Sequence, residues 1–254
     1  MTGVTDLYNN GSLASLSVSN LSAIPNVHLV GTSADTTVAM TAATTVGTAD
    51  AMTVAMSSAA TSANANLTAQ GIETFNVLAS VASGSATASQ TLTSSSARSV
   101  AITGDASTNI TVNLAGAGAT EALTGSVTGN AAANTMNVTA DVTDFLSVDL
   151  GAGNDILILP NGIGENYTLA GGEGVNVLGL TQAGATATDA DATISDFDVL
   201  NIIDAGTGTI DTWWQRRWCR LKRWAPAAAP SATWSPAPCT WARQARGRNR
   251  GRCA

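Results

Sequence analysis

The sequence predicts an all-β protein and, within that class, a parallel β-solenoid of the β-helix or β-roll kind. Two observations lead to this prediction. Apolar and polar residues alternate with period two in short runs throughout residues 1–211, and clusters of Gly, Asn, Ser and Asp separate these runs. No helical period competes with the alternation. Strands spaced in this way also suit tandem β-sandwich modules, which stay open as the alternative.

The predicted strands follow one another along the chain. In each run, Val, Ile, Leu or Met alternates with Thr, Ser, Asn or Ala, so that one face of the strand can be buried. The runs lie at residues 37–42, 51–56, 99–104, 109–115, 135–140 and 146–150. The Ala-rich stretch 55–67 favours one or two helical turns at most, because its Ser and Asn residues are poor helix formers.

A longer, imperfect repeat indicates that the strands belong to stacked coils. Each copy has an apolar residue followed by others three, five and six places on, and the copies lie at residues 21–32, 67–80 and 192–203. Their first apolar residues, Ile24, Ile72 and Ile194, are 48 and then 122 residues apart, so the length of the repeat varies. In such coils Ala, Thr and Val would point inward, while Asn, Gly and Asp would form the tight corners.

Charge divides the chain at residue 211. Residues 1–211 hold all 18 acidic residues and one basic residue, Arg98, for a formal charge of 1 minus 18, or −17. Residues 212–254 hold the other ten basic residues and no acid. The acidic part has no Lys, Trp or Cys, which suits a secreted or surface-exposed protein, and its charge disfavours nucleic acid as a partner. No apolar run approaches the roughly 18 residues of a transmembrane segment.

We interpret the basic tail, residues 212–254, as disordered and as the product of a shifted reading frame. All six tryptophans of the chain lie in it. Tryptophan has the single codon TGG, and reading one base earlier turns each into Leu, Met or Val; residues 213–225 then allow LVATALVSAETLG, which matches the composition of residues 1–211. The alternative is a genuine tail that binds nucleic acid through Arg216, Arg217, Arg220, Lys222 and Arg223.

The stretch DLGAGNDILIL at residues 149–159 carries the most specific chemical signal. Gly151 and Gly153 permit tight turns and expose carbonyl oxygens, Asp155 supplies an anionic oxygen, and an apolar strand follows. A second copy, LAGGEGVNVLGL, follows at residues 169–180 with three glycines before its own strand.

These two stretches resemble the G-G-x-G-x-D-x-apolar-x nonapeptide of RTX proteins, in which calcium lies between consecutive turns of a parallel β-roll. Residues 21–211 are also similar in style to RTX-type S-layer proteins and large repetitive adhesins of Gram-negative bacteria. The resemblance implies calcium-dependent folding outside the cell. It implies calcium ligands at Gly151, Gly153, Asn154, Asp155, Gly172, Glu173 and Asn176.

The chain departs from the nonapeptide pattern in several places. Leu150 stands where the first glycine belongs, and Asn176 stands where the second copy should have Asp. Asp155 and Asn176 are 21 residues apart, whereas two tandem nonapeptides would place them at twice nine. The extra residues, PNGIGENY at 160–167, should therefore bulge as a loop. A degenerate, purely structural coil without calcium is the alternative.

Residues suited to catalysis are scarce. His28 is the only histidine and lies in an alternating run, so we expect it to face solvent from a strand rather than to serve a Ser-His-Asp triad. Asp196 and Asp198 should project from one face of a strand, where they could act as acid and base. We favour a solvated polar face or calcium ligation for this pair. Arg98 alone cannot form an anion site.

Three regions are therefore predicted: a repetitive β-rich region at 1–140, an RTX-like β-roll at 141–211 and the basic tail at 212–254. The expected function is that of a structural fragment of a secreted, calcium-stiffened repetitive surface protein, with no catalytic site. Its partner would be another copy of itself or a cell-surface polysaccharide. The alternative is the passenger region of a β-helical carbohydrate-active enzyme, either a lyase or an epimerase.

Overall fold

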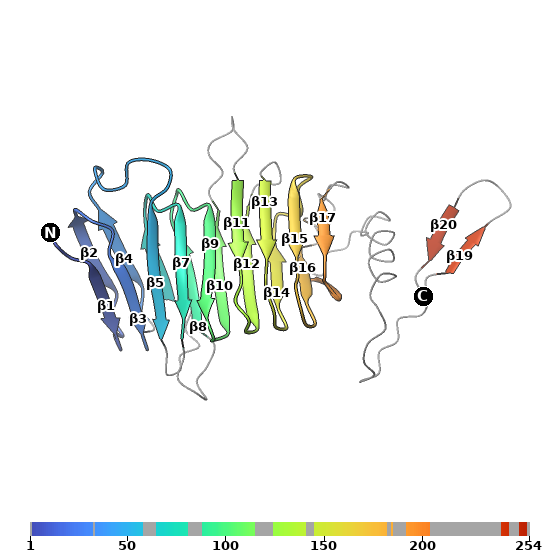
Figure 1. Cartoon of the computed structure of the whole chain (residues 1–254), viewed down its shortest axis with the longest axis horizontal. Helices are drawn as coiled ribbons and strands as arrows, with labels where there is room; N and C mark the ends of the chain where they lie inside the picture. Colours follow the sequence, from blue (N-terminus) through green and yellow to red (C-terminus); the bar gives the residue numbers. More distant parts are fainter. Residues whose placement is uncertain are drawn as a thin grey trace. The chain divides into compact units, whose positions relative to one another are not determined.

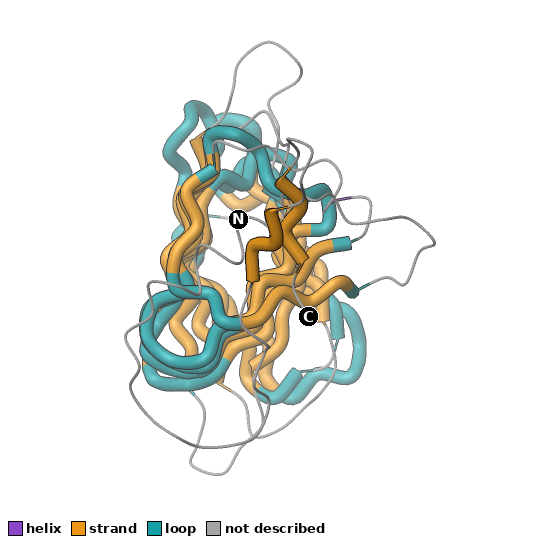
Figure 2. Tube along the Cα trace, turned by 90° about the vertical axis from the view of Figure 1, so that its right-hand side faces the viewer, coloured by secondary structure: helices purple, strands orange, loops and turns teal. Residues whose placement is uncertain are grey.

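The chain forms a parallel β-solenoid, as the alternation predicts (Figure 1). In a computed structural model, two nine-stranded parallel sheets lie against each other (Figure 2). The parallel pairing excludes the sandwich alternative, because β-sandwiches are built from antiparallel sheets. The structure describes residues 2–32, 34–57, 65–80, 88–114, 124–140, 145–181, 184, 192–203, 240–243 and 249–252.

The odd-numbered strands form one sheet, called here the odd sheet. It contains β1 (Asp6–Asn10), β3 (Asn26–Val30), β5 (Ala51–Ser57), β7 (Thr74–Ala79), β9 (Ser99–Gly104), β11 (Thr124–Thr128), β13 (Phe145–Asp149), β15 (Tyr167–Ala170) and β17 (Thr193–Ser195). The even-numbered strands form the even sheet. It contains β2 (Leu16–Leu21), β4 (Thr36–Met40), β6 (Ala65–Ala69), β8 (Ala88–Thr93), β10 (Thr108–Asn113), β12 (Asn134–Thr139), β14 (Ile156–Leu159), β16 (Val177–Leu180) and β18 (Val199–Ile202).

The chain crosses from one sheet to the other after every strand, so two strands and two corners make one coil. Each strand pairs in parallel with the strand two before it and the strand two after it. Val27 thus pairs with Val54, and Val54 with Val77, which stacks equivalent side chains in columns along the solenoid. A coil cannot bury its apolar face alone and depends on its neighbours.

The core is the narrow space between the two sheets. In β7 the buried residues Phe75, Val77 and Ala79 alternate with more exposed ones. The same alternation runs through β10 and β12 of the even sheet. Tyr167 and Phe75 are the largest fully buried side chains. Period two in the sequence therefore determines which residues face inward, because successive side chains of a strand point to opposite faces.

The coils differ in length, as the imperfect repeat predicts. β1 and β3 pair Asp6 with Asn26, an offset of 20 residues, whereas β9 and β11 pair Ser99 with Ser126, an offset of 27. The repeated stretches at 21–32 and 67–80 both lead from an even strand into an odd strand, but 192–203 leads from β17 into β18. The third copy is therefore not structurally equivalent to the first two.

Both sheets continue without a break across residue 140, the predicted boundary between two regions. The chain divides instead into a unit of residues 1–204 and a unit of residues 205–254. In the second unit, the strands β19 (Thr240–Arg243) and β20 (Asn249–Arg252) pair antiparallel. The rest of the predicted tail, and most of the Ala-rich stretch 55–67, lie outside the described residues. In the described part of the chain, no helix is long and apolar enough to cross a membrane.

Candidate functional site

The predicted calcium ligands lie together in two consecutive coils, at the corners that lead from an odd strand into an even strand. One corner joins β13 to β14 and the other joins β15 to β16. Ile156 pairs with Val177, so the 21-residue offset is the length of one coil rather than a nonapeptide pair with an insertion. The predicted bulge at 160–167 is wrong, because Ile163 in it is fully buried and Tyr167 begins β15.

The glycines of these corners let consecutive coils approach closely. Gly151, Gly153, Gly172 and Gly174 all have positive φ. A Cβ atom on Gly172 would collide with the carbonyl oxygen of Gly151, and one on Gly174 would collide with that of Gly153. The glycine spacing that suggested an ion site therefore has a steric reason of its own.

The backbone groups of the two corners bond to each other. Glu173 N–H donates to Gly151 O (2.9 Å), and Gly153 N–H donates to Glu173 O (3.0 Å). The Asn176 amide donates through Nδ2 to Gly172 O (3.1 Å). A carbonyl oxygen has two lone pairs, so these oxygens keep capacity for a cation.

Polar side chains form a ladder through four successive odd-to-even corners. Asn134 N–H donates to Asp155 Oδ1 (2.7 Å) and Asp155 N–H donates to Asn176 Oδ1 (2.9 Å). Asn176 N–H donates in turn to Asp198 Oδ2 (3.1 Å). We call these four residues the corner ladder. Each rung satisfies a backbone N–H at the start of an even strand or directly before it, and thereby ties one coil to the next.

Asp155 breaks the pattern of the corner ladder. At Asn134 and Asn176, the amide nitrogen of the side chain donates to backbone carbonyl oxygens: Ala132 O for Asn134, and Gly172 O and Asp196 O for Asn176. Asp155 is fully buried but has a carboxyl oxygen, Oδ2, that finds no partner among the described residues. Burial raises the pKa of Asp155, while the N–H of Asn134 opposes this.

This unpartnered oxygen is the feature of the corner that best fits a cation. A buried anionic oxygen is stabilised by a proton or a metal ion, and carboxylate with carbonyl oxygens is the ligand set that calcium prefers. Asn154 and Glu173 are exposed, and Asn154 Oδ1 already accepts the N–H of Val175 (2.8 Å). In the described residues no three His, Cys, Asp or Glu side chains gather closely enough to hold a metal ion. Calcium binding at this corner stays a prediction.

The predicted placement of Asp196 and Asp198 on one strand is wrong. They lie in the turn between β17 and β18, and Asp196 has a φ of 59°. Asp198 belongs to the corner ladder through Asn176, while Asp196 is exposed and its backbone oxygen accepts the Asn176 amide. Short polar side chains tolerate this left-handed conformation, and turns use them for that reason.

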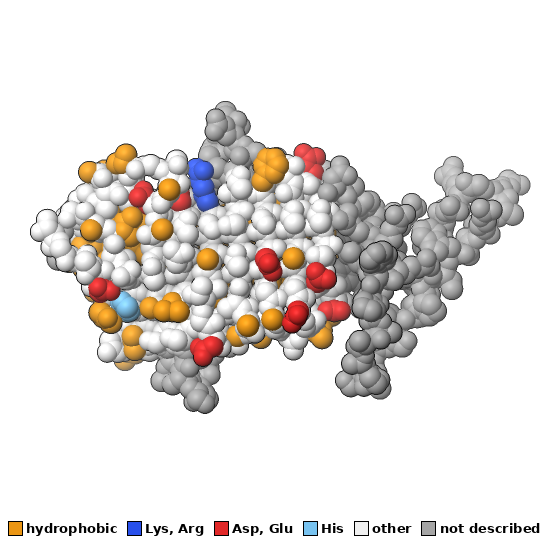
Figure 3. Space-filling model, in the orientation of Figure 1, with side chains coloured by type: hydrophobic (Ala, Val, Ile, Leu, Met, Phe, Trp, Pro, Cys, Tyr) orange, Lys and Arg blue, Asp and Glu red, His pale blue; other side chains and the backbone are white. Residues whose placement is uncertain are grey.

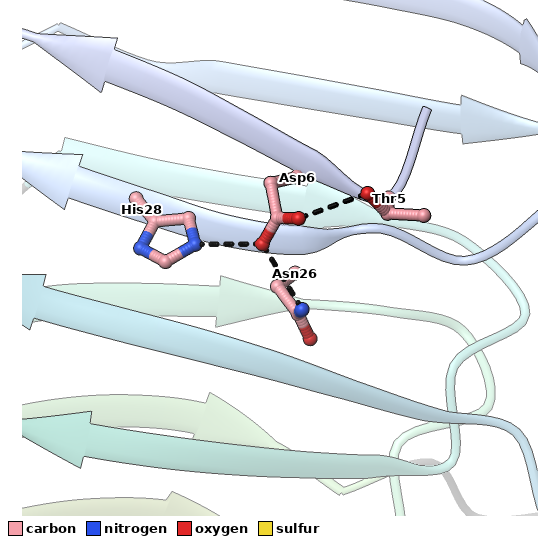
Figure 4. Close-up of polar contacts among 4 residues, drawn as sticks. All are labelled: Thr5, Asp6, Asn26 and His28. Carbon is pink, nitrogen blue, oxygen red and sulfur yellow. Dashed lines mark hydrogen bonds and ion pairs between the residues drawn. The ribbon is translucent and has the colours of Figure 1, made fainter. Parts of the chain in front are cut away.

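His28 faces outward from β3, as predicted, and lies in a small cluster on the odd sheet (Figure 4). Its Nε2 lies 3.1 Å from Asp6 Oδ1, which also accepts the amide of Asn26 (3.1 Å). The ring of Tyr8 stacks on the imidazole, with centroids 4.2 Å apart. Hydrogen bonds from Asn26, His28 and Thr5 lower the pKa of Asp6. Sequence reasoning missed this cluster because strand register, not sequence distance, brings β1 beside β3.

Other acidic residues also serve the backbone. Glu73 is buried and its Oε2 accepts the N–H of Asp50 (2.8 Å). Asp35 Oδ1 accepts the N–H of Asn66 (2.9 Å), and Asp149 Oδ1 accepts that of Gly151 (3.1 Å). The face that carries His28 shows few charged side chains, and acidic ones gather over the later strands (Figure 3).

No family model, no curated protein and no solved structure matches this chain. The corner ladder and the stacked glycines therefore have to be interpreted from their own chemistry.

Proposed function

We propose that residues 2–203 are a rigid structural segment of a secreted, repetitive surface protein, and that they act as a scaffold rather than as a catalyst. The main support for this proposal is that acidic side chains accept hydrogen bonds from the backbone. Glu73, Asp155 and Asp198 each accept a backbone N–H of a neighbouring coil. A carboxylate that holds the backbone in this way is not free to move a proton or attack a substrate.

The outer surface of the even sheet supports the same proposal. Every outward-facing side chain that the structure describes on β6, β8, β10 and β12 is Thr or Asn: Asn66, Thr68, Thr91, Thr93, Asn109, Thr111, Asn113, Thr135, Asn137 and Thr139. Thr favours strands, and neither Thr nor Asn carries a charge. A surface of this kind is soluble, and it holds no aromatic platform or charged cleft for a sugar substrate.

Calcium would stiffen this scaffold at the corner ladder. An ion held by Asp155 Oδ2, with carbonyl oxygens from Gly151 and Gly172, would neutralise the buried carboxyl oxygen of the ladder that has no partner among the described residues. Thermal unfolding followed by circular dichroism tests this. Millimolar calcium should raise the midpoint of the wild type, but not that of Asp155→Asn. Asp35→Asn serves as the control, because Asp35 is exposed and lies outside the ladder. An unchanged wild-type midpoint would exclude the calcium site.

The scaffold role itself is tested against the carbohydrate-active alternative. The intact chain is incubated with acidic polysaccharides, and unsaturated products and epimerised sugars are measured. We expect neither. Product formation that disappears in Asp196→Asn would overturn the scaffold proposal, since this carboxyl is exposed and lies outside the hydrogen bonds of the corner ladder.

The proposed location is the cell surface. A protease added to intact cells of the source organism should cleave the protein, while a cytoplasmic marker stays intact. Protection of the protein until the cells are broken would contradict a surface location.

A further inference from the structure

The outer surface of the even sheet is a regular array of uncharged polar side chains. It consists of the Thr and Asn residues of β6, β8, β10 and β12 named above, and we call it the Thr/Asn face. Each of these strands presents at least two of them at alternate positions, such as Thr91 and Thr93 on β8. Asn66, Asn109 and Asn113 are exposed and the other members are half-buried, so the face is open to solvent.

Strand register arranges these residues in columns that cross the strands. Two columns each take one residue from β6, β8, β10 and β12. The first contains Asn66, Thr91, Thr111 and Asn137, and the second contains Thr68, Thr93, Asn113 and Thr139. No register shift interrupts the described pairs of these four strands. Neighbours in a column are therefore one strand separation apart, about 4.7 to 4.9 Å, and neighbours along a strand are about 6.6 Å apart.

Ice is a solid whose hydrogen-bonding groups repeat at nearly the same intervals. Each of its water molecules bonds tetrahedrally to its neighbours at an O···O distance of about 2.75 Å. Tetrahedral geometry then places second neighbours about 4.5 Å apart and repeats the stacked layers every 7.3 Å or about that. Both intervals agree with those of the Thr/Asn face to within about a tenth. Over only four strands, the accumulated difference stays below the length of one hydrogen bond.

The chemistry of the Thr/Asn face also suits a neutral, hydrogen-bonding ligand. The Thr hydroxyl and the Asn amide both donate and accept hydrogen bonds, as water does. Residues 1–211 are strongly acidic, yet none of the described outward-facing side chains of these four strands is charged. Asp35 lies at the edge of the face, where its Oδ1 accepts the amide of Asn66 (3.2 Å). Ice excludes ions, so a charge within the face would oppose contact with the crystal.

We propose that the Thr/Asn face binds ice, with each column hydrogen-bonded to a row of water oxygens at the crystal surface. Stacked coils hold the columns in place, and Thr has a restricted χ1, so little side-chain freedom is lost on binding. The face ends at β14, where Ile158 takes the next place after Asn137 in the first column. Ice binding is a function beyond the scaffold role. A chain that ignores ice can still be a scaffold, because the tests of that role measure sugar products and protease access.

Uptake into slowly growing ice tests the proposal on the full chain. Freezing drives ordinary solutes into the remaining liquid, whereas a protein bound to the crystal surface is overgrown and retained. A marker protein of similar size that does not bind ice is added to the same solution, to correct for trapped liquid. Immunoblotting of the melted ice measures both proteins. We expect the wild type to be enriched several-fold over the marker.

A lysine in the centre of the Thr/Asn face should abolish this enrichment. Thr111→Lys places a long charged side chain between the two waters rows that the columns would contact, and should lower the uptake to that of the marker. The matched control is Thr168→Lys, which adds the same charge at an exposed position on the outer surface of the odd sheet and should keep the wild-type uptake. Both side chains point outward, so each lysine amine reaches solvent in the free chain. Circular dichroism checks the fold, and Thr93→Lys replaces Thr111→Lys if the latter does not fold.

Four results would overturn the proposal. Wild-type uptake no greater than that of the marker is the first. Undiminished uptake of Thr111→Lys would place the contact elsewhere on the chain. Equal losses in Thr111→Lys and Thr168→Lys would mean that added charge alone reduces the uptake. Finally, the wild type could be excluded from ice but retained, through Thr111, on powdered cellulose or chitin, and the ligand would then be a neutral polysaccharide.

Discussion

The carboxyl group of Asp155 differs from its neighbours in the corner ladder by one atom. Asn134 and Asn176 place an amide nitrogen where Asp155 places Oδ2, and their nitrogens donate to backbone oxygens. We expect Asp155→Asn to raise the free energy of unfolding in calcium-free buffer by about 1 to 3 kcal/mol, the usual cost of an unsatisfied buried polar group. Urea unfolding monitored by circular dichroism measures it. A destabilised variant would show that Oδ2 has a partner after all.

The same residue predicts a dependence on pH. Burial raises the pKa of Asp155 in the folded chain, so folding favours the neutral carboxyl. Its stabilising contribution is complete below the pKa of the unfolded chain and is lost as pH rises through the folded pKa. In calcium-free buffer, the stability gap between Asp155→Asn and the wild type should therefore widen from acidic toward neutral pH. A gap that stays constant with pH would contradict the raised pKa.

Gly172 tests whether the corner glycines serve close stacking. A Cβ there would collide with the backbone oxygen of Gly151, in addition to the strain of a positive φ. Gly47 is the matched control, because it also has a positive φ but nothing within 4 Å of the added atom. Gly172→Ala should lower the free energy of unfolding by more than Gly47→Ala, which should cost about 1 to 3 kcal/mol through backbone strain. Equal losses would mean that backbone conformation alone explains the glycine.

At the scale of the strand, burial decides the effect of a substitution. Phe75 and Leu78 both lie in β7, but Phe75 is fully buried and Leu78 is 43% exposed. Phe75→Ala should destabilise the chain by about 3 to 5 kcal/mol through lost burial and a cavity. Leu78→Ala should cost well under half of that. Thermal unfolding of the two variants compares them, and similar losses would contradict the assigned faces of the strand.

The strands could be predicted from sequence because their signal is local. The runs at 51–56 and 99–104 match β5 and β9 almost residue for residue. The roles of the corner residues could not be predicted as well, because these roles depend on which residue of a neighbouring coil lies next to each of them. In the sequence, the 21-residue offset between Asp155 and Asn176 resembles an imperfect pair of nonapeptides. In the structure, this offset is the length of one coil. The predicted ligands do lie in neighbouring corners. The hydrogen bonds of the corner ladder, however, depend on the register between strands of different coils, which the sequence does not reveal.

At the scale of the molecule, the acidic solenoid and the basic tail belong to separate units. We expect residues 1–204 alone to keep the β-sheet circular dichroism signal and the unfolding midpoint of the whole chain, since the described contacts of the sheets all lie within that range. A lower midpoint for the shortened chain would show that the tail stabilises the solenoid. Sequencing the coding DNA around codon 211 would then decide whether the tail is genuine.

The unequal corners of the coils have a practical consequence. The even-to-odd corner takes four residues, Gln70–Glu73, between β6 and β7, but extends from Thr181 to Ala192 between β16 and β17, while the strands on both sides keep parallel register. On the opposite side, the four odd-to-even corners that carry the corner ladder, from β11–β12 to β17–β18, are all short, because the strands they join leave at most six residues between them. Foreign peptides grafted into the even-to-odd corners would be displayed along one side of the solenoid. The distances between them would be whole multiples of the separation between neighbouring strands.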